Sequence, residues 1–522
     1  MLQRPNMAKL ASNPLVPAIV ALAIIVTAAT YAIVDDEGDT AKKLAEPGPD
    51  TEATPSPGTT TVPTATATAG PGRAAATEAP LPGLPGAIEK PCNPRPVNEI
   101  GVTDTTITIG QVVTDSSQIP QQFRPANEGL RAFVNYINQR GGVCKRKLQL
   151  ESRNDNLNLA QHSQDMQQLA NSVLAFVANE SLLDFLDYDR EPPYAPSVRG
   201  GGKEVPDVGG LAFSLGRAQS SWHAGVVGSI SPVLVGGGQY RNAMEDLRRK
   251  NTPCLKAGVV HLDEPTGASR QQAELGAISI EASWGGGLGA GKATLYQAQF
   301  VDPVPAYEVL VDRMVSEGVN CVFAYSDLGS SINLVKAMVN RGVWPPGQCN
   351  RGSQCIRYTY IPLSALDPKF VRDVGPGSRG VSSFAPTPPL NETANPGMKL
   401  YLDALKSVPG AEPTTFSVLG FASGAMLVQA LQSCPEAPTR ICVMNALRKM
   451  QNFTASGLLG GTTPFRKTKV NFDGTTFDWK HIFNHSVGVQ VADRNGKRDF
   501  YRVYPEKGYL ADTLKVARGK AA

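Results

Sequence analysis

The alternation of hydrophobic and polar residues between Glu99 and Val143 predicts a strand followed by a helix. The segment GVTDTTITIGQVV is rich in β-branched residues and alternates in polarity, which is typical of a strand. After the polar loop Thr114–Phe123, apolar residues recur at helical spacing from Leu130 to Ile137, and Gly141-Gly142 ends the pattern. A second strand at Lys147–Glu151 completes a βα unit that feeds a parallel sheet.

The same pattern continues along the chain. Further strands are expected at Val173–Ala178, Val208–Phe213, Lys256–His261 and Val319–Tyr325. Helices are expected at Asn158–Leu174, Ser221–Ser229, Ser269–Ile278, Val304–Glu317, Ser331–Asn340, Phe416–Leu431 and Val443–Met450. Asp473-Gly474 and Asn495-Gly496 turns then separate alternating runs, which predicts a β ending rich in hairpins. The order favours an α/β protein with two parallel-sheet lobes joined by hinge crossovers, and a ligand site in the cleft between them.

The N-terminal region predicts a membrane anchor and a tether. Leu15–Val34 is mostly apolar and, at about 20 residues, is long enough to span a bilayer. Arg4 and Lys9 precede it and acidic residues follow it, which orients the bulk of the chain outside the cytoplasm. We favour an uncleaved, single-pass transmembrane signal-anchor over a cleaved signal peptide. The Thr-, Pro- and Ala-rich stretch from Asp35 to about Pro96 cannot bury a core and is expected to be a disordered linker.

These patterns give a domain plan. A cytoplasmic tip and anchor occupy 1–34 and the tether 35–96. Lobe 1 comprises 97–220 and 385–462, and lobe 2 comprises 221–384 and 463–522.

Composition and motifs argue against several other functions. A net charge of +4, with 18% charged residues, gives no indication of a nucleic-acid partner. GGLGAGKA at Gly286–Ala293 resembles a phosphate-binding loop, but Ala293 stands where a magnesium-binding hydroxyl is required. The five histidines show no metal-ligand spacing and no G-x-S-x-G motif occurs. We therefore expect a binding protein without a cofactor, a metal or catalytic residues.

The eight cysteines form no C-x-x-C motif, and an extracytoplasmic location favours disulfides. Pairing in sequence order would join Cys92 to Cys144, Cys254 to Cys321, Cys349 to Cys355, and Cys434 to Cys442. Eight cysteines allow 105 pairings, so the sequence leaves the connectivity open.

Two blocks of the chain resemble a known family. They are GVTDTTITIG…FVNYINQRGGV…LQLESRNDN and FVDPVPAYEVLVDRMVSEGVNCVFAYSDLGSSINLVKAMVNRGVWP. Together they resemble the branched-chain amino-acid-binding type of solute-binding protein, which has a type I periplasmic-binding fold and serves ABC importers. The resemblance covers roughly Val97 to the C-terminus. It implies a small polar solute as ligand, and a membrane permease with a cytoplasmic ATPase as partners.

The resemblance also implies that loops after particular strands hold the ligand. The implied ligand-binding residues are Thr114, Asp115, Ser116, Asn179, Glu180, Ser181, Asp263, Thr266, Tyr325, Ser326 and Asp327. For an amino acid, Asp327 would bind the ammonium group and Ser181 the carboxylate. Alternatives for these residues are helix caps, turns and core packing. Thr266 replaces the aromatic residue that usually precedes the glycine, here Gly267, so a different polar or cationic solute is an alternative ligand.

The sequence thus predicts a membrane-tethered, extracytoplasmic solute-binding protein for an ABC importer. A ligand-sensing receptor that reports to a signalling partner, or an adhesion module, would show the same fold and stays an alternative.

Overall fold

The computed structural model describes residues 92–508 with short gaps. The gaps are 117–121, 185–203, 214–216, 218–219, 221, 227–239, 241–242, 265–266, 285–290, 300–301, 350, 451–452, 460–461, 464–467, 473–474, 480–482 and 504–506. The predicted anchor and the tether up to residue 91 lie outside the described residues. Within the described ranges, no helix has the length and apolar character needed to cross a bilayer.

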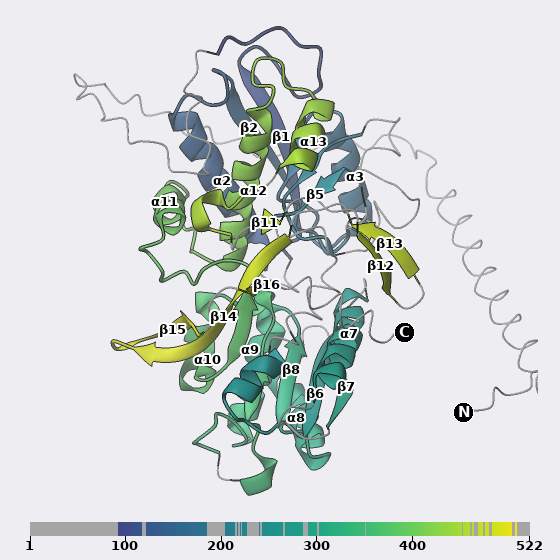
Figure 1. Ribbon diagram of the computed structural model, residues 1–522, viewed down its shortest axis with the longest axis vertical. Coiled ribbons are helices and arrows are strands. Elements are labelled where there is room, and N and C mark those ends of the chain that lie inside the picture. Colours follow the sequence, from purple (N-terminus) through teal and green to yellow (C-terminus); the bar gives the residue numbers. More distant parts are fainter. Residues whose placement is uncertain are drawn as a thin grey trace, which may run out of the picture. The chain divides into compact units, whose positions relative to one another are not determined.

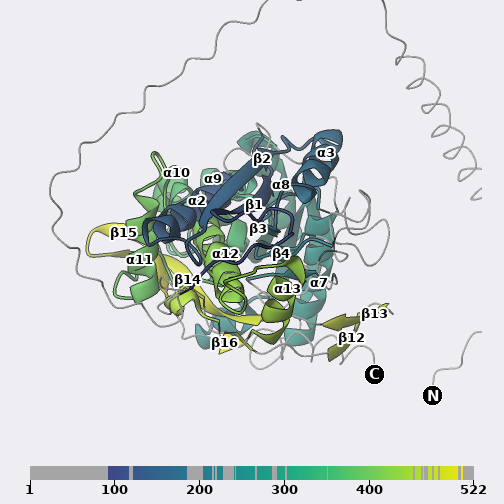
Figure 2. The same ribbon diagram turned by 90° about the horizontal axis from the view of Figure 1, so that it is seen from above.

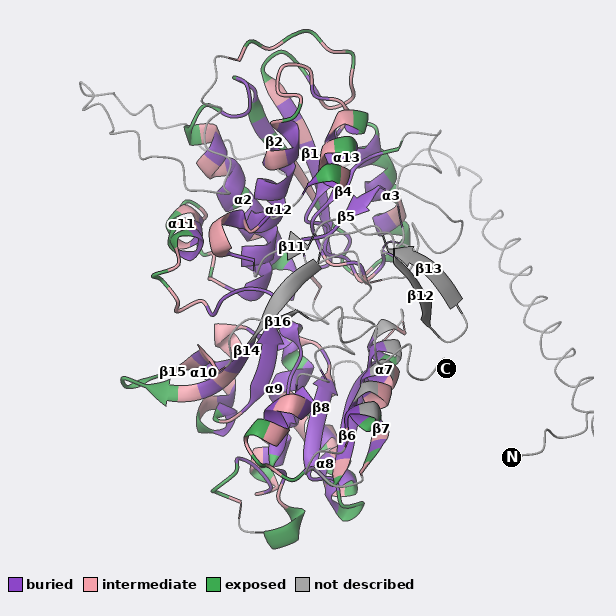
Figure 3. Ribbon diagram, in the orientation of Figure 1, coloured by how far each residue is buried: buried purple, intermediate pink, exposed green. Residues whose placement is uncertain are grey.

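Five parallel strands form a first sheet in the order β2-β1-β3-β4-β5 (Figure 1). The strands are β1 (Thr106–Val113), β2 (Lys147–Asn154), β3 (Ala175–Val177), β4 (Asp207–Val208) and β5 (His223–Ala224). β1 alternates between two cores: Ile107 and Ile109 join the main core of this lobe, whereas Val112 joins a smaller one. Alternate residues of β1 therefore face different cores, and the strand is mostly buried (Figure 3).

Helices cover both faces of this sheet. The main core includes residues of α2 (Arg124–Gln139), α11 (Pro396–Leu405), α12 (Thr415–Leu431) and α13 (Arg440–Lys449). The smaller core includes Met166 and Leu169 of α3 (Leu159–Ala170), which lies on the other face of the sheet (Figure 2). α2 and α12 cross closely through glycines, since a Cβ on Gly129 would lie 1.8 Å from the Ser417 carbonyl oxygen. Side chains at this crossing would force the two helices apart.

The second sheet repeats the same strand order. Its strands run β7-β6-β8-β9-β10, all parallel, and β14 adds to β10 antiparallel. They are β6 (Lys256–Asp263), β7 (Lys292–Gln299), β8 (Cys321–Tyr325), β9 (Tyr358–Tyr360), β10 (Ser382–Ala385) and β14 (Phe483–Arg494). The helices of this lobe include α7 (Ala268–Ser283), α8 (Val304–Ser316), α9 (Leu328–Asn340) and α10 (Pro368–Val374).

The C-terminal region forms antiparallel strands, as the turn signals predict. β12 (Thr468–Phe472) pairs with β13 (Thr475–Trp479), and β14 pairs with β15 (Lys497–Arg502) around the Asn495-Gly496 turn. β14 also pairs with the short strands β11 (Thr462–Thr463) and β16 (Lys507–Gly508). The chain thus crosses between the lobes after β5, after β10 and before β11, which gives the expected two lobes with several crossovers.

The structure corrects two predicted elements. The helix predicted at Ser221–Ser229 is wrong, because His223 and Ala224 form β5 and pair with β4. β5 consequently belongs to the first sheet, and the boundary of lobe 1 lies beyond residue 220. The strand predicted at Val208–Phe213 ends at Val208. Short apolar runs do not distinguish a buried strand from a helix by periodicity alone, which explains the first error.

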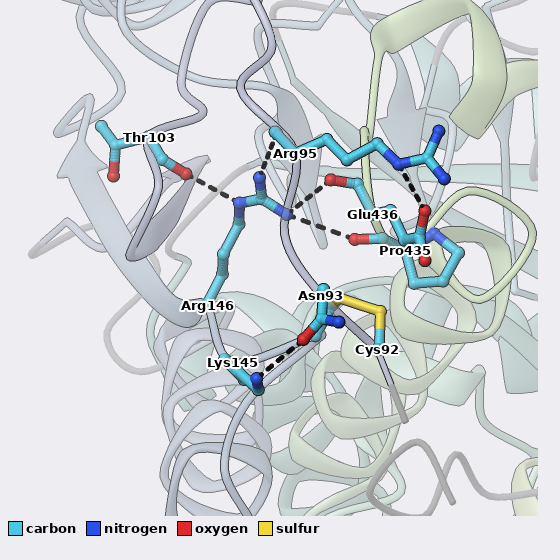
Figure 4. The surroundings of a disulfide bond; sticks show 9 residues. Cys92, Asn93, Arg95, Thr103, Lys145, Arg146, Pro435 and Glu436 are labelled. Atoms are coloured by element: carbon cyan, nitrogen blue, oxygen red, sulfur yellow. Dashed lines mark hydrogen bonds and ion pairs between the residues drawn. A yellow bond between two sulfur atoms is a disulfide. The ribbon is translucent and has the colours of Figure 1, made fainter. Parts of the chain in front are cut away.

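All four predicted disulfides are confirmed: Cys92–Cys144, Cys254–Cys321, Cys349–Cys355 and Cys434–Cys442. The first lies beside a fully buried arginine, Arg146 (Figure 4). The guanidinium group of Arg146 donates hydrogen bonds to the backbone carbonyls of Thr103, Arg95, Pro435 and Glu436. Residues 92–96, which the sequence plan assigned to the tether, are therefore fastened to the first lobe.

Candidate functional site

The loops predicted to bind a solute follow the strands at which each sheet reverses its order. In the first sheet, β2 lies on one side of β1 and β3 lies on the other side. In the second sheet, β7 and β8 flank β6 in the same way. Ligands of open parallel sheets bind beside the carboxyl ends of strands at such a reversal. Thr114–Ser116 and Asn179–Ser181 follow β1 and β3, whereas Asp263 ends β6 and Tyr325–Asp327 lies at the end of β8. Thr266 lies outside the described residues.

A buried carboxylate holds the two first-lobe loops together. Asp155 Oδ2 accepts hydrogen bonds from Ser181 Oγ at 2.5 Å and from Thr114 Oγ1 at 3.1 Å, and His162 Nδ1 lies 3.0 Å away. All four side chains are at most 2% exposed. The hydroxyls of Thr114 and Ser181, both predicted as ligand contacts, therefore have partners within the protein. Asp155 and His162 were not among the predicted site residues.

Asn179, Asp115 and Ser116, the other small residues of these loops, differ in their hydrogen-bond partners. Asn179 Oδ1 accepts a hydrogen bond from the Val112 N–H at 2.8 Å. The backbone N–H of Asp115 donates to Asn154 Oδ1 at 2.9 Å, and the Asp115 carbonyl accepts from Asn154 Nδ2 at 2.8 Å. Ser116 is half-buried, and its Oγ is fully buried without a hydrogen-bond partner among the described residues. Ser116 is thus a first-lobe candidate whose hydroxyl has no hydrogen-bond partner in the described part of the chain.

Glu180 is fully buried and carries a carboxyl group with an unusual environment. Its Oε1 accepts a hydrogen bond from the Leu211 N–H at 3.0 Å, and its Oε2 has no partner among the described residues. Burial raises the pKa of Glu180 well above its usual range, and the positive charge of Arg217 only partly opposes this. Burial therefore favours the neutral form of the Glu180 carboxyl group over its charged form.

A buried ionic network lies next to Glu180. Arg217, 1% exposed, donates to both carboxylate oxygens of Asp207, at 2.8 Å and 3.1 Å, and to Asp184 Oδ2 at 3.3 Å. His223 Nδ1 lies 3.1 Å from Asp207 Oδ2. Burial alone would raise the pKa of Asp207, but Arg217 and His223 outweigh it and hold that pKa well below its usual range. The sequence contained a signal for this network, since an acid that opens a buried strand requires a partner.

The second-lobe candidates lie at the ends of β6 and β8. Asp263 is exposed. Tyr325 is half-buried, and its ring packs against that of Tyr240 with 5.9 Å between the centroids. Ser326 Oγ lies 2.8 Å from Ser331 Oγ. Tyr325 and Ser326 therefore border the loop and also support the start of α9.

Asp327 is the N-cap of α9. Its Oδ1 accepts from the Ser330 N–H at 3.0 Å, and its Oδ2 accepts from Ser330 Oγ at 2.5 Å. This confirms the capping alternative considered for Asp327. Capping occupies one lone pair of each carboxylate oxygen and keeps the negative charge at the N-terminus of the helix.

Within the described ranges, a hydrogen bond joins a loop of the first lobe directly to a loop of the second. Gln122 Oε1, from the loop between β1 and α2, accepts a hydrogen bond from the Leu328 N–H at 3.1 Å. Gln122 is 6% exposed and Leu328 is 5% exposed. Next to Gln122, the Phe123 ring packs edge-on against Phe213 and Phe416, each at 5.2 Å. The loops that follow β1 and β8 therefore meet, as expected for facing sides of one site.

Comparisons with known proteins agree with this architecture. A family model described as periplasmic binding protein matches residues 106–477, well over half of the chain. No curated protein sequence matches the chain.

Solved structures share the fold at low sequence identity. A fatty acid ABC transporter substrate-binding protein from Thermomonospora curvata is 17% identical, with 80% of this chain and 95% of that chain covered and a TM-score of 0.58. A solute-binding protein of an ABC transporter from R. palustris, in complex with 4-hydroxybenzoate, is 14% identical over 78% and 98% of the two chains, with a TM-score of 0.58. A branched-chain amino acid transporter substrate-binding protein from Streptococcus pneumoniae, in complex with isoleucine, is 14% identical over 77% and 100%, with a TM-score of 0.55.

Proposed function

Because the chain belongs to the periplasmic binding protein family, a family of binding proteins rather than enzymes, we propose that it delivers a small polar solute to an ABC importer. The solute, an amino acid or a similar molecule, would bind between the two lobes and be enclosed by a hinge movement. A permease with a cytoplasmic ATPase would then receive it. The similar proteins from Thermomonospora curvata and R. palustris are described as ABC transporter binding proteins, which supports this choice of partner.

The observation that carries the proposal is the meeting of two loops at the reversal points of the two sheets. The Gln122–Leu328 hydrogen bond connects the loop after β1 with the loop after β8. Both loops lie where open parallel sheets bind ligands. A solute at this place would be reached from both lobes, which is what enclosure by hinge movement requires.

The side chains at the two loops suggest how a solute would be held. Ser116 offers a hydroxyl, and Asp327 offers a carboxylate whose second lone pairs are not used by the cap. The raised pKa of Glu180 favours its neutral form, which would tolerate an acidic group nearby better than a charged carboxylate would. These features suit a zwitterion or a weak acid with hydroxyl or ammonium donors.

The location follows from the sequence alone. The apolar segment 15–34, the basic residues before it and the Pro- and Thr-rich stretch after it support a membrane-anchored protein with its lobes outside the cytoplasm. Disulfide bonds are common in such compartments, and all eight cysteines are paired, in agreement with this location.

A thermal-shift screen tests the proposal. The probes are isoleucine, 4-hydroxybenzoate and a medium-chain fatty acid, together with the other common amino acids, each at saturating concentration. We expect at least one of them to raise the melting temperature, because ligands that bind only the folded state stabilise it. A Ser116→Ala variant should lose part of the shift, whereas Ser316→Ala, on the outside of α8, should keep it. No shift with any probe would argue against small-solute capture.

A further inference from the structure

Gln122 connects the two lobes by a hydrogen bond that needs no bound solute. It lies directly before α2, and its side chain is almost completely buried. Its amide oxygen accepts from the backbone N–H of Leu328, the first residue of α9 in the other lobe. Apart from the crossover segments, this is a direct bond between the two loops that face one another at the sheet reversals.

The N–H of Leu328 needs a partner from outside its helix. The first N–H groups of a helix have no acceptor within the helix. The cap residue Asp327 accepts from the N–H and the hydroxyl of Ser330, and its backbone carbonyl accepts from Ser331. Gln122 therefore supplies an acceptor for a buried donor that Asp327 does not serve. Separation of the lobes would expose that donor to water, so the bond favours the joined arrangement.

The base of the Gln122 side chain is held firmly. The neighbouring Phe123 is 2% exposed and packs against Phe213 and against Phe416 of α12. On the other side, Leu328 is buried in the second-lobe core. Because Phe123 anchors the backbone beside Gln122 and Leu328 is buried, a separation of the lobes beyond the reach of the Gln122 side chain would break the bond.

We propose that the Gln122–Leu328 hydrogen bond is a latch that keeps the two lobes joined without the help of a solute. This proposal rests on the lobe movement of the proposed function, but it does not depend on which solute binds or on whether one binds. Together with the hydrogen bond from Thr415 Oγ1 to the Leu366 carbonyl, which also joins the two lobes, the latch would influence the fraction of molecules that are open to entry. A typical hydrogen bond of this kind shifts such an equilibrium by about fivefold.

Distance measurements between two spin labels test the latch. All eight native cysteines are in disulfides, so two introduced cysteines, Gln149→Cys on β2 and Val309→Cys on α8, would be the accessible thiols. Both positions are exposed. The labelled chain is dialysed exhaustively, no solute is added, and the populations of short and long distances are compared between variants.

Gln122→Met keeps the length of the side chain and removes the acceptor, so we expect about a fivefold shift towards the open population. Gln122→Glu keeps an acceptor and should restore the joined population. Gln167→Met, at an exposed position on α3, should leave the distances unchanged. Identical distance distributions for the wild type and Gln122→Met would overturn the latch, whatever the thermal-shift screen finds.

Hydrogen exchange gives a second readout that does not depend on labels. The Leu328 amide should exchange slowly in the wild type and faster in Gln122→Met, while the Ser330 amide, which is bonded to Asp327, stays protected. Equal exchange of the Leu328 amide in both proteins would likewise contradict the latch. If Gln122→Met folds poorly, the same comparison is made with Gln122→Ala.

Discussion

The carboxylate of Asp327 accepts two hydrogen bonds from Ser330, one from its backbone N–H at 3.0 Å and one from its hydroxyl at 2.5 Å. The residue that the family resemblance assigns to a solute's ammonium group is thus also the cap of α9. The two roles make different demands, because capping needs an acceptor oxygen whereas an ammonium group needs a negative charge. Substitutions can therefore separate them.

Asp327→Ala should destabilise the protein by about 1 kcal/mol, because the α9 cap is lost. Asp327→Asn should leave stability nearly unchanged, since asparagine caps helices about as well as aspartate. If Asp327 also binds an ammonium group, the Asn variant should weaken amino-acid binding while unfolding in urea is unaltered. Asp403→Asn, at an exposed position on α11 outside the candidate site, serves as control. Equal affinity of Asp327→Asn and wild type for an amino-acid ligand would leave Asp327 with the capping role alone.

The Asp155 cluster should be important for stability. Asp155→Ala would leave Thr114, Ser181 and His162 buried without their shared acceptor. Unsatisfied buried groups cost about 1–3 kcal/mol each, so we expect a loss of about 3 kcal/mol in the free energy of unfolding. Asp403→Ala removes an exposed ion pair with Lys406 and should change it by less than about 1 kcal/mol. Denaturation curves that fail to separate the two variants would contradict the role given to Asp155.

Glu180 should make stability depend on pH in a defined direction. Burial raises its pKa in the folded protein, so the folded state holds a proton that the unfolded state releases above its ordinary pKa. Stability therefore falls as the pH rises from the unfolded pKa towards the folded pKa. Glu180→Gln removes this effect, so the variant should be relatively more stable than wild type at pH 8 than at pH 4. A difference in unfolding free energy that does not vary between these pH values would show that Glu180 is ionised in the fold.

The disulfides should contribute unequally to stability. Cys254–Cys321 closes a loop with a sequence separation of 67, whereas Cys349–Cys355 has a separation of 6. The chain-entropy relation gives about 4 kcal/mol for the longer loop and about 2 kcal/mol for the shorter one. Paired alanine substitutions, followed by urea denaturation, should reproduce this order. A larger loss from the Cys349 and Cys355 pair would mean that packing, rather than loop closure, dominates.

The sequence predicted those parts of the fold that depend on local pattern. The strand and helix after Glu99 follow from periodicity, and the turn at Asn495-Gly496 follows from turn chemistry, whereas the sequence left the disulfide connectivity open. β5 was missed because it is short and its His223 is buried through a polar network with Asp207 and Arg217, which periodicity does not encode.

The places of the candidate loops in the fold were predicted, but the bonding of their side chains was not. The loops after β1, β3, β6 and β8 lie at the sheet reversals, as the order of elements implied. The partners of their side chains come from distant segments: Asp155 and His162 for Ser181, and Leu328 for Gln122. Contacts of this kind depend on three-dimensional packing, so they could not be read from the loops themselves.

Native mass spectrometry of the freshly purified full chain tests the central claim most directly. If the protein captures a solute between its lobes, a fraction of the molecules should carry one small molecule per chain, which denaturation releases and whose mass identifies it. The Asp155→Ala variant, with its loops loosened, should retain less of it. A spectrum that shows only the bare chain, combined with no adduct after incubation with amino acids, hydroxybenzoates and fatty acids, would contradict the claim that this chain is a solute-binding protein.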